Sequence, residues 1–196
     1  MVTSAAMGSS EGPSVGIPEA DSAGVPKADS TGTSTFDLRA AIAAIPDPEV
    51  PVVTIEDLGI LREVGVDEQA RTVTVLITPT YSGCPAMEAI RHHIEHVAKR
   101  QGYVASVQTR LSPAWTTDWM SAAGRDKLRE FGIAPPGPRS EVVGQPTGLR
   151  LMARRVTCPL CGSADTKEIS RFGSTACKAL RRCNKCREPF DEFKTM

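Results

Sequence analysis

Apolar residues recur at two spacings in the first two thirds of the chain, and these spacings predict helices packed on a small sheet. Leu38, Ile42 and Ile45 follow the i, i+4, i+7 pattern of one helical face, and a proline comes directly after them. Residues 72–78 alternate between apolar and polar, which is the period of a half-buried strand. Another strand is expected over 60–66, joined to the first by a short polar turn.

A second helix is expected to begin at Pro85, since proline is favoured at the first helical position, and to end before Gly102. Its core-facing stripe consists of Ile90, Ile94 and Val97. A third strand over 103–111 and a last helix over 117–131 complete the pattern. The sequence therefore predicts an α/β (α+β) domain over 35–132, in which a small three-stranded mixed sheet packs against helices.

The segments outside this domain have a different composition. Residues 1–34 are rich in Ser, Gly, Ala and Pro and contain no aromatic residue, so a disordered tail is expected there. Residues 133–152 hold four prolines and few apolar residues, which is typical of a linker. Residues 153–196 carry five of the six cysteines and are expected to form a separate small module.

The cysteine spacing in this module predicts a metal site. Cys158 and Cys161 form one C-x-x-C pair, and Cys183 and Cys186 form a second pair after 21 intervening residues. Two such turns can aim four thiolates at one tetrahedral ion, and four protein ligands leave no open position, so a structural zinc ion is expected. A rubredoxin-like iron site stays open as an alternative, because it uses the same four thiolates.

Other residues could carry chemistry, and each has a plainer alternative. Cys84 is expected at the start of a helix, where the dipole and free N–H groups favour a thiolate, but it could also be a small cap residue. Cys177 is either a spare thiol or metal ligand beside the zinc, or a half-buried free cysteine. Asp47 and Asp57 could bind a metal or order their turns. His92 and His96 face away from the apolar stripe and are expected to be solvated.

Charge and composition exclude several function classes. The formal net charge of zero gives no indication of a nucleic-acid partner, and no apolar run is long enough to cross a membrane. The expected zinc module has ten Lys and Arg against five Asp and Glu, but it lacks an aromatic stacking platform, so nucleic-acid binding is not expected. No export signal is evident, so the chain is expected to be cytoplasmic with reduced cysteines.

Several segments together resemble a known family. They are Asp-Pro-Glu-Val-Pro at 47–51, Asp-Leu-Gly at 57–59, Thr-Pro-Thr-Tyr-Ser-Gly-Cys-Pro at 78–85, Ser-Pro-Ala-Trp-Thr-Thr-Asp-Trp-Met at 112–120, the two cysteine pairs, 172–177 and Pro-Phe-Asp at 189–191. They resemble the SufT/PaaD family of iron–sulfur assembly domains, and more closely its PaaD (PaaJ) branch, which carries a C-terminal zinc ribbon. The resemblance covers about residues 35–196.

The resemblance implies a non-catalytic accessory subunit of the ring-1,2-phenylacetyl-CoA epoxidase of phenylacetate catabolism. It implies that the oxygenase and reductase subunits are partners, and that the protein helps to mature their diiron or iron–sulfur centres. Cys84 takes the place of the family's metal-handling cysteine, and Asp47 and Asp57 match its acidic loop positions, with iron or a cluster held transiently.

Three points remain open at this level. An iron–sulfur cluster is held by four protein ligands, so Cys84 alone cannot bind one. The other ligands could come from Cys177, from a second copy of the chain or from a client protein. A structural subunit without metal transfer is the alternative function. An independent enzyme is not expected, since no phosphate-binding Gly loop, Ser/His/Asp set or open metal site is evident.

Overall fold

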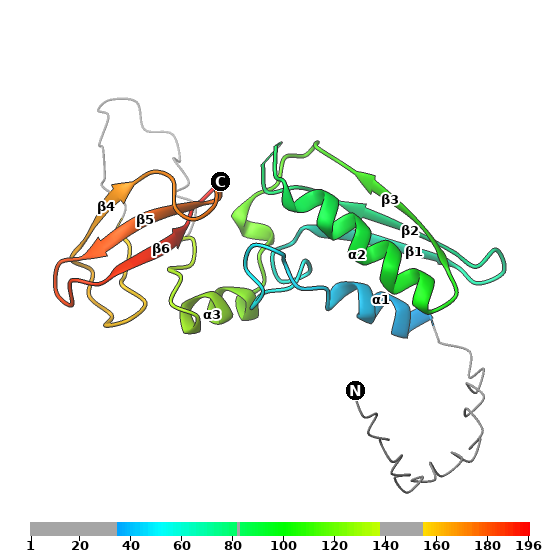
Figure 1. The fold of residues 1–196 in the computed structure, drawn as a ribbon, viewed down its shortest axis with the longest axis horizontal. Coiled ribbons are helices and arrows are strands. Elements are labelled where there is room, and N and C mark those ends of the chain that lie inside the picture. The colour runs from blue at the N-terminus through cyan, green and yellow to red at the C-terminus, as the bar shows by residue number, and fades with distance from the viewer. Residues whose placement is uncertain (1–34, 82, 138–154) are drawn as a thin grey trace, which may run out of the picture. The chain divides into compact units, whose positions relative to one another are not determined.

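Within the part of the chain that the structure describes, two three-stranded sheets follow one another (Figure 1). The structure, a computed structural model, describes residues 35–81, 83–137 and 155–196. The expected tail over 1–34 and the part of the expected linker over 138–152 lie outside the described residues. Both sheets belong to one unit, Thr33–Met196. In chain order the elements are α1 (Thr35–Ala43), β1 (Leu61–Asp67), β2 (Thr72–Ile77), α2 (Ala86–Arg100), β3 (Val104–Thr109), a 3₁₀ turn (Thr117–Trp119), α3 (Ala122–Glu130), β4 (Thr166–Ser170), β5 (Lys178–Cys183) and β6 (Pro189–Phe193).

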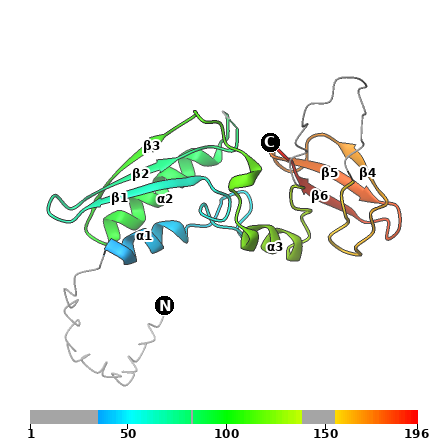
Figure 2. The same ribbon diagram turned by 180° about the vertical axis from the view of Figure 1, so that it is seen from behind.

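The first sheet is mixed, as expected, and has the order β1-β2-β3. β1 pairs antiparallel with β2, and β3 pairs parallel with β2 from Thr72↔Val104 to Ile77↔Thr109. A parallel neighbour needs a crossover connection, and α2 provides it. α2 lies across one face of this sheet, as the views from both sides show (Figures 1 and 2).

The core of this domain lies between α1, α2 and the sheet. The expected face of β2 is buried completely, since Val73, Val75 and Ile77 have no exposed area. On α2, Ile90 and Ile94 are equally buried, but Ala98 rather than the predicted Val97 completes the stripe. Ala98 continues the i, i+4, i+8 row from Ile90, and Val97 packs at the edge of the core.

Two predicted helix starts are wrong. The last helix begins at Ala122 and not near residue 117, because Ser121 is extended and its hydroxyl caps the helix by accepting from the N–H of Gly124 (2.8 Å). The residues before it form the separate 3₁₀ turn, capped by Thr116. Pro85 is the N-cap of α2 and not its first helical residue. The Ser121 cap sets where α3 begins, whereas Pro85 has helical φ and ψ and makes no side-chain cap hydrogen bond, so at α2 the difference is a single position.

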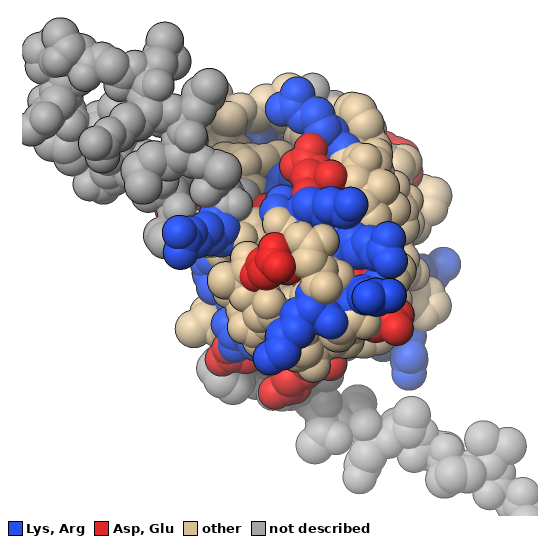
Figure 3. Space-filling view, turned by 90° about the vertical axis from the view of Figure 1, so that its left-hand side faces the viewer, with Lys and Arg blue, Asp and Glu red and all other residues tan. Residues whose placement is uncertain are grey.

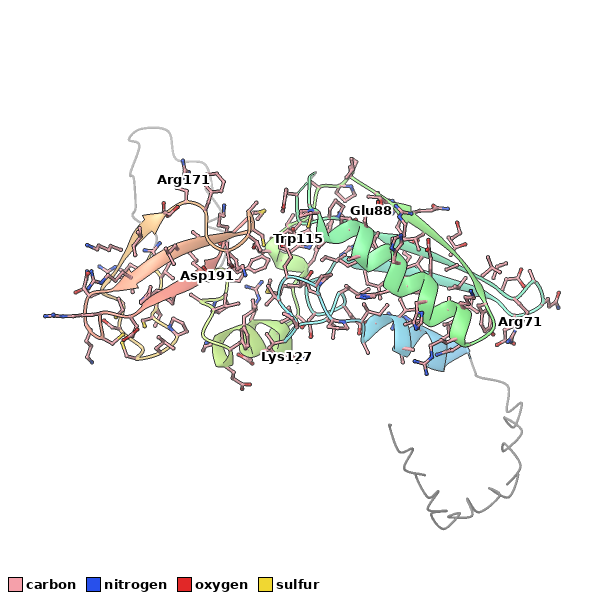
Figure 4. The ribbon with its side chains drawn as sticks, viewed as in Figure 1. Arg71, Glu88, Trp115, Lys127, Arg171 and Asp191 are labelled. Carbon is pink, nitrogen blue, oxygen red and sulfur yellow. The ribbon has the colours of Figure 1, made fainter. Side chains whose placement is uncertain are left out.

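The second sheet is antiparallel throughout, in the order β4-β5-β6. We refer to residues 155–196 as the ribbon. Backbone hydrogen bonds tie the ribbon to the segment after α3: the N–H of Ala134 donates to the carbonyl oxygen of Asp191 (2.8 Å), and the N–H of Phe193 donates to that of Ala134 (2.9 Å). The Phe193 ring lies 6.1 Å from that of Trp115 and is fully buried. Trp115 and Asp191 are labelled in Figure 4.

Candidate metal-binding sites

The four paired cysteines come together at one end of the ribbon. Cys158 and Cys161 lie in a turn before β4, which is closed by a hydrogen bond from the N–H of Gly162 to the carbonyl oxygen of Cys158 (2.9 Å). Cys183 ends β5, and Cys186 lies in the turn that leads to β6. The strand pairing of β5 with β4 and β6 therefore brings two turns that are distant in sequence to the same point.

The positions of the four sulfur atoms fit one tetrahedral ion. The Sγ atoms of Cys158 and Cys186 are 3.8 Å apart, and those of Cys161 and Cys183 are 3.5 Å apart. All four lie within 4.8 Å of one another. A zinc ion with Zn–S bonds of about 2.3 Å requires S···S separations of about 3.8 Å. The N–H of Cys186 points at Sγ of Cys183 and lowers the pKa of that thiol to about 6, which favours the thiolate form that metals bind.

Two more cysteines and two carboxylates gather where the ribbon contacts the first domain. We call Asp47, Glu49, Cys84 and Cys177 the thiol–carboxylate cluster. The two acids lie in the loop after α1, Cys84 lies just before α2, and Cys177 lies just before β5. The thiol of Cys177 points at Oε2 of Glu49 over 4.0 Å, although the two residues are 128 positions apart. Cys177 is buried in the core of the first domain, and Cys84 packs against that core.

The acidic loop of the cluster has a defined local structure. Oδ1 of Asp47 accepts the backbone N–H groups of Glu49 (2.9 Å) and Val50 (2.8 Å), so this carboxylate closes the turn that carries Glu49. Asp47 is 5% exposed, and Glu49 is half-buried. Asp47 therefore orders its turn, which agrees with the plainer of the two interpretations, and in doing so it sets the position of the Glu49 side chain.

Electrostatics hold both thiols of the cluster in the neutral form. Burial raises the pKa of Cys84, against the lowering effect of the Ala86 N–H, and the negative charges of Glu49 and Asp47 add to the increase. Burial also raises the pKa of Cys177, with Glu49 and Asp47 adding to the effect against Thr175 and Lys178. The N–H of Ala86 at the helix start does act to lower the pKa of Cys84, as expected, but burial prevails and the net pKa is raised. Both carboxylates also have raised pKa values, mainly through burial.

Asp57, the fourth predicted residue of this group, has a different set of partners. Its Oδ1 accepts from the hydroxyl of Ser121 (2.9 Å), and its Oδ2 accepts from Nζ of Lys127 on α3 (2.6 Å; Figure 4). Burial acts to raise the pKa of Asp57, but the hydrogen bonds from Lys127, Thr54 and Ser121 prevail and lower it. Asp57 is not among the groups that act on the pKa of either thiol. It joins its loop to α3.

Other sequence predictions can be placed as well. His92 and His96 are exposed on α2, as expected, and His93 is exposed too. Glu49 was not singled out as a site residue, although its position two residues after Asp47 in an Asp-Pro-Glu turn was the available signal. The end of the molecule formed by the ribbon carries basic side chains interspersed with acidic ones (Figure 3). None of the described helices combines the length and apolar character that a bilayer crossing requires.

Comparison with known proteins identifies the two parts of the chain. Residues 36–108 match the family of iron–sulfur cluster assembly proteins, and residues 144–194 match the PaaD zinc beta ribbon domain. A protein of Escherichia coli (strain K12), named as the D subunit of a "Putative 1,2-phenylacetyl-CoA epoxidase", is 46% identical over 159 residues, which are 81% of this chain and 91% of the relative.

Two solved structures are also similar. A domain of unknown function from Bacillus anthracis shares 27% identity over 47% of this chain and 89% of its own, with a TM-score of 0.43. A conserved hypothetical protein from Thermotoga maritima shares 27% identity over 51% of this chain and 98% of its own, with a TM-score of 0.41. Because the curated relative is matched over most of both chains, and both parts match their family models, this chain belongs to the PaaD family of phenylacetyl-CoA epoxidase components, which join an iron–sulfur assembly domain to a C-terminal zinc ribbon.

Proposed function

We propose that this protein is a non-catalytic accessory subunit of the ring-1,2-phenylacetyl-CoA epoxidase that helps to mature the enzyme's iron–sulfur or diiron centres in the cytoplasm. Its partners are then the oxygenase and reductase subunits of that complex. The observation that carries the proposal is the position of Cys177: the ribbon places this thiol beside Glu49 of the assembly domain, in a cluster that also holds Cys84. Thiols and carboxylates are groups that bind iron.

In this proposal the ribbon holds a zinc ion through Cys158, Cys161, Cys183 and Cys186, and the ion has a structural role. Four thiolates complete a tetrahedral shell, so the ion has no position for water or substrate. The apolar core around this site is small: it consists of Ala134, Val156, Cys158, Cys183 and Phe190, with Cys186 packed against it. Metal binding supplies stability that such a core lacks. The zinc ion thereby keeps β5 in place, and with it Cys177 at its start.

The thiol–carboxylate cluster is suited to transient rather than permanent binding. An iron–sulfur cluster is held by four protein ligands, usually all cysteines, and the thiol–carboxylate cluster offers two thiols. Additional ligands would come from the client protein or from a second copy of the chain. Iron or an iron–sulfur cluster bound in this incomplete way can leave for a client that offers a complete set of ligands.

Controlled removal of the protein separates maturation from a structural role. The epoxidase complex is assembled in cells that contain this protein, which is then depleted by induced proteolysis before activity is measured. A maturation factor has completed its work by then, so epoxidase activity and iron content are expected to persist. Cells that never contained the protein should yield an epoxidase deficient in iron.

The alternative, a structural subunit without metal transfer, predicts the opposite result. Activity would fall on depletion and return when metal-free protein is added back to the complex. Cells that carry Cys84→Ser serve as the matched test of the cluster, and His93→Ala, an exposed position on α2, is the control. If Cys84→Ser and His93→Ala support equal iron loading of the epoxidase, the role of the cluster in maturation is wrong.

A further inference from the structure

The thiol–carboxylate cluster contains potential metal ligands from both parts of the chain. Cys84 and Glu49 belong to the assembly domain, whereas Cys177 comes from the ribbon. The backbone of Cys177 is held in place, since its carbonyl oxygen accepts from the N–H of Lys194 (2.9 Å), and Oγ1 of Thr175 lies 3.0 Å from its Sγ atom. The ribbon thus presents this thiol in a fixed position.

We propose that Cys84, Cys177 and Glu49 form a binding site for a single ferrous ion, with a fourth position open to water or to a donor atom of a client. The choice of iron over other divalent ions rests on the proposed function, whereas the site rests on the approach of Cys177 to Glu49 and on the packing of Cys84 against the core that buries Cys177. The site is complete only when the ribbon is docked on the assembly domain, because one of its two thiols belongs to the ribbon.

The distance between two of the proposed ligand atoms supports this assignment. Sγ of Cys177 and Oε2 of Glu49 are 4.0 Å apart, and a tetrahedral ion with bonds of about 2.3 Å to sulfur and 2.1 Å to oxygen requires about 3.6 Å. Among the described residues, the four ribbon cysteines are the group whose ligand atoms all lie within 4.8 Å of one another. The second site is therefore wider in this structure, and its side chains must turn inward to bind an ion.

The charges around the cluster also favour a cation. Burial raises the pKa values of both thiols and both carboxylates, and the negative charge of Asp47 adds to the increase at Glu49 and at both thiols. The pKa of Tyr81 beside them is raised as well, by burial and by Cys84 and Glu49. Lys178 is the cation that acts on this group, and its ammonium group is also paired with Asp191 (3.6 Å). A divalent ion would supply the missing positive charge as the two thiols release two protons to solvent.

The ligand set distinguishes this site from the zinc site of the ribbon. Two thiolates and one carboxylate suit borderline divalent ions such as Fe²⁺, Co²⁺ and Zn²⁺. Three protein ligands leave a coordination position free, which is the arrangement of sites that exchange or react, whereas four close the shell. Asp47 is not assigned as a ligand, since its Oδ1 atom already accepts two backbone N–H groups.

Metal titration of the full chain tests the site directly. Zinc-loaded protein is titrated anaerobically with Co²⁺, which reports thiolate ligation through its charge-transfer absorption, and then with Fe²⁺, with metal analysis after desalting. We expect one Co²⁺ or Fe²⁺ per chain in addition to a retained zinc ion. Cys84→Ser and Cys177→Ser should each weaken binding about tenfold or more and reduce the charge-transfer absorption by about half.

Two carboxylate variants provide the matched comparison. Glu49→Gln should weaken binding about tenfold while leaving the charge-transfer intensity per bound Co²⁺ unchanged. Glu56→Gln, an exposed residue of the same loop region that pairs with Arg39, should bind as the unaltered chain does. Zinc content and circular dichroism verify that each variant is folded.

The inference is overturned if the unaltered chain takes up no second ion without losing zinc, or if Cys177→Ser binds as tightly as the unaltered chain. Either result would leave the maturation role standing, because that role is measured as iron in the epoxidase in cells. Conversely, a second ion that binds as described, in a protein that does not affect the iron content of the epoxidase, would overturn the proposed function alone.

Discussion

Gly59 lies where the turn at 57–59 packs closely against the segment that contains Trp119. Its φ of +69° lies in the left-handed region, and a Cβ atom placed on it would lie 2.5 Å from the carbonyl oxygen of Trp119. Trp115, from the same segment as Trp119, donates its indole N–H to the carbonyl oxygen of Leu58 (2.9 Å). The Asp-Leu-Gly turn at 57–59 therefore requires glycine for two reasons, the backbone conformation and the lack of space.

Gly59→Ala is accordingly expected to lower the free energy of unfolding by about 2–5 kcal/mol, the sum of a left-handed backbone and an overpacked contact. Gly162→Ala is the matched control, because Gly162 has a similar φ of +72° but no atom within 4 Å of the added Cβ. It should cost about 1–2 kcal/mol. Denaturant unfolding of the zinc-loaded proteins measures both values. Equal losses would show that the contact with Trp119 contributes nothing.

At the scale of elements, the two sheets depend on different sources of stability. The mixed sheet has a continuous apolar core made by α1, α2 and β2, with side chains such as Ile42, Val75 and Ile94 completely buried. In the ribbon, β4 contributes no fully buried residue, and Ile169 is 51% exposed. Most of the buried apolar side chains of β5 and β6 lie around the four-cysteine site or against the first domain, so this sheet depends on its metal site and on docking.

Removal of the ribbon metal should therefore affect the two sheets differently. After exhaustive chelation, backbone amides of β4 and β5 are expected to lose their protection from hydrogen exchange, while those of β2 keep theirs. Exchange measured by mass spectrometry at peptide resolution provides the comparison, and re-addition of zinc should restore the original pattern. Unchanged protection in β4 and β5 after complete metal removal would contradict a structural role for the ion.

At the scale of the whole molecule, the contact between the ribbon and the assembly domain brings Cys177 to the other members of the thiol–carboxylate cluster. Phe193 carries this contact, since it is 1% exposed and belongs to the same apolar core as the assembly domain. The carbonyl oxygen of Met196 accepts from the N–H of Thr117 (3.3 Å), which extends the contact to the last residue. Loss of docking would separate Cys177 from Glu49 without altering either ligand.

Phe193→Ala should thus cost about 3–5 kcal/mol of stability and change the fluorescence of the neighbouring Trp115, because a large buried ring is removed. Phe172→Ala is the control, as this ring is 69% exposed, and it should cost less than about 0.5 kcal/mol. Thermal unfolding and tryptophan emission are measured on both variants. Similar effects for the two rings would show that Phe193 does not hold the ribbon in place.

Much of the local structure could be predicted from the sequence, because its causes lie within a few residues. The i, i+4 spacing of Leu38 and Ile42 predicted a buried helical face, and alternation predicted the buried face of β2. The errors at Pro85 and near residue 117 were errors of boundary: the first is a single position, and the second was decided by the cap at Ser121. The paired C-x-x-C spacing likewise anticipated the gathering of four sulfur atoms.

The thiol–carboxylate cluster illustrates what the sequence alone could not decide. By itself, the sequence determined where helices and strands form and which cysteines are paired by spacing, because periodicity and turn geometry act locally. It also offered Asp47, Cys84 and Cys177 as candidate metal ligands. Only the tertiary structure decided that Cys177 meets Glu49 across 128 positions, that Asp57 pairs with Lys127 instead, and that the pKa of Cys84 is raised. These outcomes depend on burial and on charges brought together from segments that are distant in sequence, and both exist only in the folded chain; the first of them also requires the ribbon to be docked.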